Sequence, residues 1–338
     1  MATLVDRGLL FQLIQSSTSI AVVSDFLKRK HLHFSAGSWE DMFTLRLIPY
    51  LDDGSITIAE LVSLLRNVEE YGRQHIFLYR TTTTIALSLL DRTAVAARLQ
   101  NMSLSNLMVG PSLYDHPETP TISDVRWVVN ENGVDEGLII KEIQSRSHYR
   151  FLGEEETPTG LIKSYERERE RGVNIARLHS NGILEIRIAS RKGPSRYFDD
   201  LRAFRIRIRP LLPPDGFAEV SLQKAKNTLW QSKASYAGKI RFSEIAARNS
   251  DDYILKAAGG SLEANIGDNQ ASVDSLSSFI AAAGQCESYN LWLSKNHTPS
   301  EREIHFLISG EPHEFAINAN CTQEDYEYVL SELWALNT

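Results

Sequence analysis

The sequence predicts an α+β protein in which a helical N-terminal domain precedes a mostly antiparallel β-sheet domain with flanking helices. Apolar residues recur at helical spacing up to about residue 108, and they alternate with polar residues after about residue 122. A stretch rich in Pro, Gly and polar residues separates the two patterns. We therefore predict a helical domain over residues 1–108, a linker over 109–122 and a sheet domain over 123–338.

The helical domain is predicted from apolar side chains three and four residues apart, which give each helix one apolar face. Thr57 and Glu60 have the spacing of a capping box, so a helix is expected to begin there. The expected helices cover residues 9–14, 22–27, 42–48, 61–71, 74–79 and 84–98. Together they predict a compact all-helical domain.

The sheet domain is predicted from strands with one buried face, in which apolar and polar side chains alternate. The expected strands cover residues 125–129, 137–141, 148–152, 184–188, 204–209, 303–308 and 314–317. A helix over Gln323–Leu336 is expected to follow them. The charge-balanced run Glu166–Arg171 is interpreted as a solvated helix turn or a loop.

A basic segment stands out in an otherwise acidic chain. Residues 177–209 carry nine Lys and Arg against three Asp and Glu, a net charge of +6, whereas the whole chain has a net charge of −7. A strand over residues 204–209 would place three arginines on one exposed face, which can hold phosphates by point charge and by arginine forks. The predicted DNA contacts are Arg187, Arg191, Lys192, Arg196, Arg202, Arg205, Arg207 and Arg209. The alternative is that these arginines pair with neighbouring carboxylates and only keep the sheet soluble.

The C-terminal part, residues 213–338, has the opposite charge. It carries nine Lys and Arg against seventeen Asp and Glu, which makes it a poor surface for DNA and a plausible one for a protein. Tyr289, Trp292 and Leu293 are the predicted anchors of a partner or of self-association, because such side chains are enriched at interface hot spots. The alternative is that the apolar residues of this part seal its own core.

The composition, with 42% apolar and 23% charged residues, is that of a globular protein. No apolar run has the length of a membrane span, and the N-terminus lacks the basic flank of a signal peptide, so we expect an intracellular protein without a membrane partner. Cys286 and Cys321 are expected to be free thiols, since their spacing fits neither a disulfide framework nor a zinc site.

No catalytic residues, metal site or cofactor are predicted, since the sequence contains no GxSxG, HExxH or GxGxxG motif. The enzymatic alternative is a metal-dependent nuclease, which would place an Asp and then Glu-x-Lys on adjacent strands. Asp135 is followed by Lys141 and Glu142 in the wrong order, and Glu185 is followed by Arg187 where the lysine belongs. A non-enzymatic protein is therefore predicted.

The segment Ser195–Ala203, with the sequence SRYFDDLRA, resembles the centromere protein N family of the inner kinetochore. In that family a similar Ser-Arg-Tyr-apolar-Asp-x-Leu-basic-Ala stretch precedes a strand of the central sheet. The order of a helical domain and then a mixed β domain is also similar over nearly the whole chain. The resemblance implies a pyrin-like helical bundle, a basic groove that takes duplex DNA, and a C-terminal region that docks a partner of related fold.

Carried over by residue, the resemblance implies that Arg196 faces DNA and that Arg202 matches a basic position. The family's first helix carries paired acidic and basic residues that read a centromeric histone, but only Asp6 and Arg7 are charged within residues 5–14. Recognition of a nucleosome is therefore not implied, whereas backbone contacts with duplex DNA are. A eukaryotic protein would be nuclear or chromosomal. A prokaryotic relative would be cytoplasmic, for example as the nucleic-acid-binding subunit of an anti-phage defence complex.

Overall fold

The computed structural model describes residues 5–191, 197–261, 263–282 and 284–337. The chain forms two compact units, each built from separate segments of the sequence. Unit 1 contains residues 1–70, 87–180 and 191–213, and unit 2 contains residues 71–86, 181–190 and 214–338. The expected division at a linker over 109–122 is therefore wrong, because this stretch lies inside unit 1 and the chain passes repeatedly between the units.

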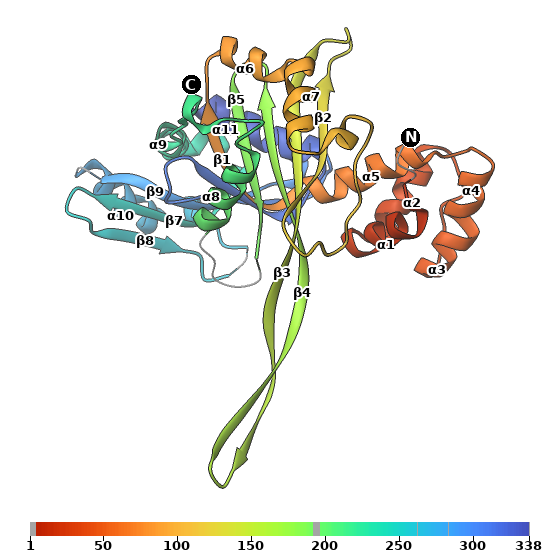
Figure 1. The fold of residues 1–338 in the computed structure, drawn as a ribbon. Helices are drawn as coiled ribbons and strands as arrows, with labels where there is room; N and C mark the ends of the chain where they lie inside the picture. Colours follow the sequence, from red (N-terminus) through yellow and green to blue (C-terminus); the bar gives the residue numbers. More distant parts are fainter. Residues whose placement is uncertain (1–4, 192–196, 262, 283, 338) are drawn as a thin grey trace. The chain divides into compact units, whose positions relative to one another are not determined.

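Unit 1 combines an N-terminal group of helices with a three-stranded antiparallel sheet in the order β2-β3-β4 (Figure 1). Its helices are α1 (Arg7–Ser17), α2 (Ile20–Arg29), α3 (Trp39–Met42), a π-helical turn (Phe43–Leu47), α4 (Ile48–Asp52), α5 (Ile58–Glu70), α7 (Arg92–Asn101) and α8 (Tyr197–Ile208). Its strands are β2 (Thr121–Val129), β3 (Asp135–Thr157) and β4 (Gly160–His179). The chain passes from unit 2 to unit 1 within helix α6 (Thr83–Leu90), between residues 86 and 87.

The N-terminal helices surround an apolar core that includes Leu10, Val23, Leu61 and Leu65. The capping box at the start of α5 forms as predicted, because the Glu60 amide donates to Thr57 Oγ1 at 3.2 Å and the Thr57 amide donates to Glu60 Oε2 at 2.8 Å. Among the described residues, no single helix is long and apolar enough to cross a membrane. Only α1 and α2 taken together have the length and composition, and this pair is bent by 112°.

Buried ion pairs join α5 to the sheet of unit 1. Lys141 Nζ lies 2.5 Å from Glu69 Oε2, and Arg171 also donates to Glu69. Arg126 on β2 donates in the same way to Glu70. Since carboxylates so deeply buried are costly unless they are paired, these contacts fix the end of α5 on β2, β3 and β4.

Unit 2 contains an antiparallel sheet in the order β5-β1-β11-β10-β9-β7-β8, with the short β6 paired to β1 (Figure 1). Its strands are β1 (Gly72–Arg80), β5 (Ile183–Ala189), β6 (Ala218–Glu219), β7 (Ile240–Asn249), β8 (Ile254–Ala258), β9 (Gly284–Leu293), β10 (Ile304–Ile308) and β11 (Glu314–Asn320). Its helices are α9 (Gln223–Gln231), α10 (Gln270–Ala281) and α11 (Gln323–Asn337).

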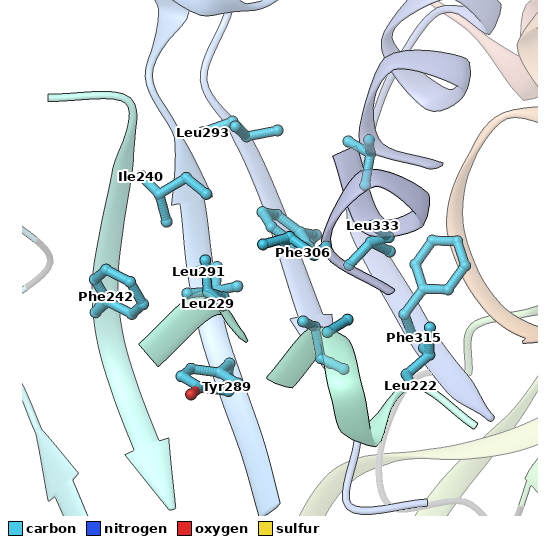
Figure 2. Close-up of a cluster of buried hydrophobic side chains, with 14 of the residues drawn as sticks. Leu222, Leu229, Ile240, Phe242, Tyr289, Leu291, Leu293, Phe306, Phe315 and Leu333 are labelled. Atoms are coloured by element: carbon cyan, nitrogen blue, oxygen red, sulfur yellow. The ribbon is translucent and has the colours of Figure 1, made fainter. Parts of the chain in front are cut away.

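The core of unit 2 lies between this sheet and its helices. Figure 2 shows Phe242, Leu291 and Phe306 on the strands, together with Leu229 of α9 and Leu333 of α11. All five side chains are buried. The predicted strands at 184–188 and 303–308 and the predicted helix at 323–336 are confirmed within one residue, and the strand predicted at 314–317 begins as expected but continues to Asn320.

Four predicted elements are wrong. Residues 74–79 form the central strand β1 instead of a helix, and their continuous apolar run reflects burial on both faces. Residues 204–208 belong to helix α8 and Arg209 lies in the turn directly after it, whereas residues 166–171 belong to strand β4. The helix expected over 84–98 is divided at Asp91, whose side chain accepts from the Ala94 amide at 2.7 Å and caps α7.

Candidate nucleic-acid interface

Helix α8 carries most of the residues predicted to contact DNA. Its apolar side chains Leu201, Phe204 and Ile208 are spaced by three and four residues, and all three are buried. Because this spacing is helical, it overrides the strand-like alternation of Phe, Arg and Ile. Ile206, which a strand would have buried beside Phe204, is instead 63% exposed.

Two of the predicted contacts are engaged by carboxylates of their own unit. Arg207 donates through Nη2 to Glu142 Oε1 at 2.9 Å and through Nε to the other carboxylate oxygen. Glu142 is fully buried and also accepts from Asn174 at 3.0 Å, so this contact fixes α8 on β3. Arg191 forms a two-pronged pair with Asp200, at 2.8 and 2.5 Å, and this hydrogen bonding raises the pKa of the Arg191 guanidinium. Both arginines have a structural partner.

Arg187 lies on β5 in unit 2, where it is 1% exposed. Its Nη2 is 2.7 Å from Glu185 Oε2, and its guanidinium lies 4.0 Å from the ring centre of Tyr326. Burial alone would lower the pKa of Arg187, but the adjacent Glu185 carboxylate holds it above the ordinary value. Arg187, one of the predicted DNA contacts, is therefore not on an exposed surface, because β5 is buried on both faces.

The remaining cations define a smaller surface, which we name the α8 arginine face: Arg202, Arg205 and Arg209. Arg202 and Arg205 lie on α8, and Arg209 lies in the turn directly after it. The three residues are three and four positions apart, so they lie on one side over about 10 Å. Arg202 and Arg209 are exposed, Arg205 is half-buried, and neither exposed arginine makes an ion pair with any described residue. Lys192 and Arg196, the other two predicted contacts, lie outside the described residues.

The carboxylates considered for a nuclease are each held by an arginine. Asp135 accepts from Arg92 at 2.7 and 2.6 Å, which lowers the pKa of Asp135, and Glu185 is paired with Arg187 as described above. Within the described part of the chain, no three His, Cys, Asp or Glu side chains converge in a way that could hold a metal ion. Each of these two carboxylates is therefore part of a structural ion pair with an arginine.

The three predicted partner anchors lie on β9 but not on one surface. Tyr289 and Leu293 are buried in the core of unit 2, so the prediction that they contact a partner is wrong. Alternation along the strand places Trp292 on the other face, where it is half-buried. Its ring stacks on His305 at 4.4 Å, and the Arg241 guanidinium lies 5.1 Å from its centre.

Sequence reasoning missed the long hairpin formed by β3 and β4. Both strands continue well beyond the paired length of β2, and their distal halves form a two-stranded ribbon (Figure 1). The signal was present in two alternating runs on either side of Thr157–Gly160, a segment with Pro and Gly. The charged run Glu166–Arg171 was misinterpreted because its alternation concerns the sign of the charge instead of hydrophobicity.

A comparison of the chain with models of known protein families gives no match. A search of curated proteins likewise finds no significantly similar sequence. The function is therefore inferred from the charge, exposure and contacts of the residues described above.

Proposed function

We propose that this protein is a non-enzymatic adaptor that binds the backbone of duplex DNA through the α8 arginine face and docks a protein partner through unit 2. The observation that carries the proposal is the exposure of Arg202 and Arg209, without a carboxylate partner among the described residues, on α8 and the turn directly after it. The other side of this helix is buried. Arg207 and its buried partner Glu142 hold this helix in place. The arginines are thus displayed at fixed positions.

Phosphate binding follows from the chemistry of these side chains. An arginine fork matches the oxygens of a phosphate, and each DNA strand offers one phosphate per 3.4 Å of helix axis. A face about 10 Å long can therefore engage consecutive phosphates of one strand. Because the chain is acidic overall, a localised basic surface favours one orientation of the bound DNA. Contacts of this kind position the duplex without reading its sequence.

We further infer a relationship to the centromere protein N family, with α1 to α5 as a pyrin-like bundle. The order of the elements supports this inference, since the helical segment precedes the strands of the mixed sheet. The described part of the shared motif, residues 197–203, forms the first half of α8. Arg202, the basic position of that motif, then lies on the proposed DNA-binding face.

The surface proposed for a protein partner is the half-buried group of Trp292, His305 and Arg241. The stacked rings and the guanidinium form an amphipathic group on the side of β9 opposite the core. Trp and Arg are the residue types most enriched at interface hot spots. This surface replaces the predicted anchors Tyr289 and Leu293.

Charge reversal on α8 tests the proposal. The variant with Arg202→Glu and Arg209→Glu should bind a 30-base-pair duplex at least about ten-fold more weakly than the original protein, measured by fluorescence anisotropy. A matched control reverses Lys295 and Arg302, two exposed cations of unit 2, and should change the affinity less than about two-fold. No binding by the original protein at micromolar concentration, or equal losses in both variants, would refute the proposal.

A further inference from the structure

Arg191 differs from the other arginines that carboxylates engage, because solvent reaches its ion pair. The carboxylates that hold Arg187 and Arg207 are fully buried. The side chain of Asp200, in contrast, is 15% exposed, and that of Arg191 is 36% exposed. Ion pairs in contact with water contribute little to stability, because water screens the charges and competes for both groups. The pair between Arg191 and Asp200 can therefore open at low cost.

Asp200 has a second arginine beside it. Its two carboxylate oxygens accept from Arg191 at 2.5 and 2.8 Å, and Oδ2 also lies 3.9 Å from Nη2 of Arg146 on β3. Arg146 is only 7% exposed, and its guanidinium donates to Asn174 Oδ1 at 3.4 Å. One carboxylate thus lies between a buried arginine and an exposed one.

The two guanidinium groups repel each other at this carboxylate. Burial lowers the pKa of Arg146, Asp200 opposes this effect, and the charge of Arg191 adds to it. Glu170, which lies opposite Arg146 in the β3–β4 ladder, acts on both arginines but less strongly than Asp200. If Arg191 leaves, the repulsion at Arg146 is relieved while Asp200 keeps Arg146 as its cation. Asp200 is therefore not left in a half-buried position without a positive charge nearby.

Arg191 is held at the N-terminal end of α8. Its backbone amide donates to Tyr197 Oη at 3.0 Å, and Tyr197 is the first residue of this helix. The guanidinium fork that grips the Asp200 carboxylate has the geometry with which arginine also grips the oxygens of a phosphate. Once released from Asp200, Arg191 is thus a phosphate ligand at one end of the helix that carries the α8 arginine face.

We propose that Asp200 takes the place of a DNA phosphate on Arg191 in the unbound protein, and that Arg191 exchanges Asp200 for a backbone phosphate when DNA binds. Arg146 then remains as the partner of Asp200. This inference rests on the proposed DNA binding by the α8 arginine face, to which it adds one contact and a built-in competitor. Because the exchange replaces one anion by another, Asp200 weakens DNA binding without preventing it.

A double-mutant cycle with a neighbouring residue as its control tests the exchange. Asp199 and Asp200 both lie in the first turn of α8, but Asp199 is exposed and makes no ion pair with any described residue. Asp200→Asn should tighten the binding of duplex DNA about two- to five-fold more than Asp199→Asn, because only the former releases Arg191. In a protein that also carries Arg191→Gln, the two substitutions should have equal effects. Fluorescence anisotropy measures all of these affinities.

Arg191→Gln alone should reduce the slope of log affinity against log salt concentration by about one, as expected for the loss of one phosphate contact. Circular dichroism checks that each variant is folded. Equal effects of Asp199→Asn and Asp200→Asn in the original protein, or an unchanged slope for Arg191→Gln, would overturn the exchange. If charge reversal at Arg202 and Arg209 still weakens binding, that result leaves the proposed function standing. A protein that binds no DNA would refute both.

Discussion

Arg187 on β5 and Arg202 on α8 belong to the same basic segment of the sequence, yet their environments are opposite. Arg187 is enclosed by Glu185, Tyr71 and Tyr326, whereas Arg202 is exposed and has no ion pair within the described residues. The difference shows that a local excess of arginine does not itself define a binding surface. A nearby buried carboxylate turns an arginine into part of the fold, and only the arginines left over can bind an external anion.

The largest expected effect is on the buried side of this comparison. Arg187→Ala leaves Glu185 buried without its cation, so the free energy of unfolding should fall by about 3–5 kcal/mol. Arg209→Ala, at an exposed position in the turn after α8, should change it by less than about 0.5 kcal/mol. Urea unfolding followed by fluorescence measures both. Similar losses for the two variants would contradict the claim that Arg187 is part of the fold and Arg209 is not.

An intermediate effect is expected at Arg207, which is neither fully buried nor free. Arg207→Ala removes the cation that pairs with the buried carboxylate of Glu142, and of the contacts described above only the one with Asn174 remains. The free energy of unfolding should therefore fall by about 1–3 kcal/mol. The same urea titration measures this loss. A loss as large as that of Arg187→Ala would indicate that α8 depends on this pair more than on its apolar anchors, contrary to the proposed arrangement.

The smallest effect concerns a cation that exists only at low pH. Burial, with a contribution from Arg241, lowers the pKa of His305, so the folded protein resists protonation there. Since an unfolded histidine titrates near about 6.5, the stability contributed by neutral His305 is present above that pH and is lost as the pH falls below it. Thermal unfolding at pH 7.5 and 5.5 should therefore show a greater acid-induced loss for the original protein than for His305→Gln. Equal losses would contradict this assignment.

Much of the fold could be predicted from local patterns. The capping box at Thr57, the half-buried strands β2 and β10 and the helix α11 each have a pattern that their own residues determine. Strand β1 could not be predicted in this way. Its burial on both faces depends on β5 and β11, which come much later in the chain. The division into two interleaved units was unpredictable for the same reason.

The candidate site was predicted only in part. The alternation of Phe204 to Arg209 favoured a strand, but the buried contacts of Leu201 and Phe204 select a helix. Arg202 precedes the predicted strand and Arg209 lies at its end, and both are exposed in the structure. These two predicted residues therefore stay in the proposed site although the element is wrong. The carboxylates that engage Arg187 and Arg207 are brought there by the tertiary structure, and no spacing rule identifies the pair between Arg207 and Glu142.

The salt dependence of DNA binding tests most directly whether the α8 arginine face contacts phosphates. Each arginine that neutralises a phosphate adds about one unit to the slope of log affinity against log salt concentration. We predict that replacing Arg202 and Arg209 by Gln reduces this slope by about two, for any duplex sequence. A slope identical to that of the original protein would show that neither arginine contacts the DNA backbone, and it would contradict the proposed function.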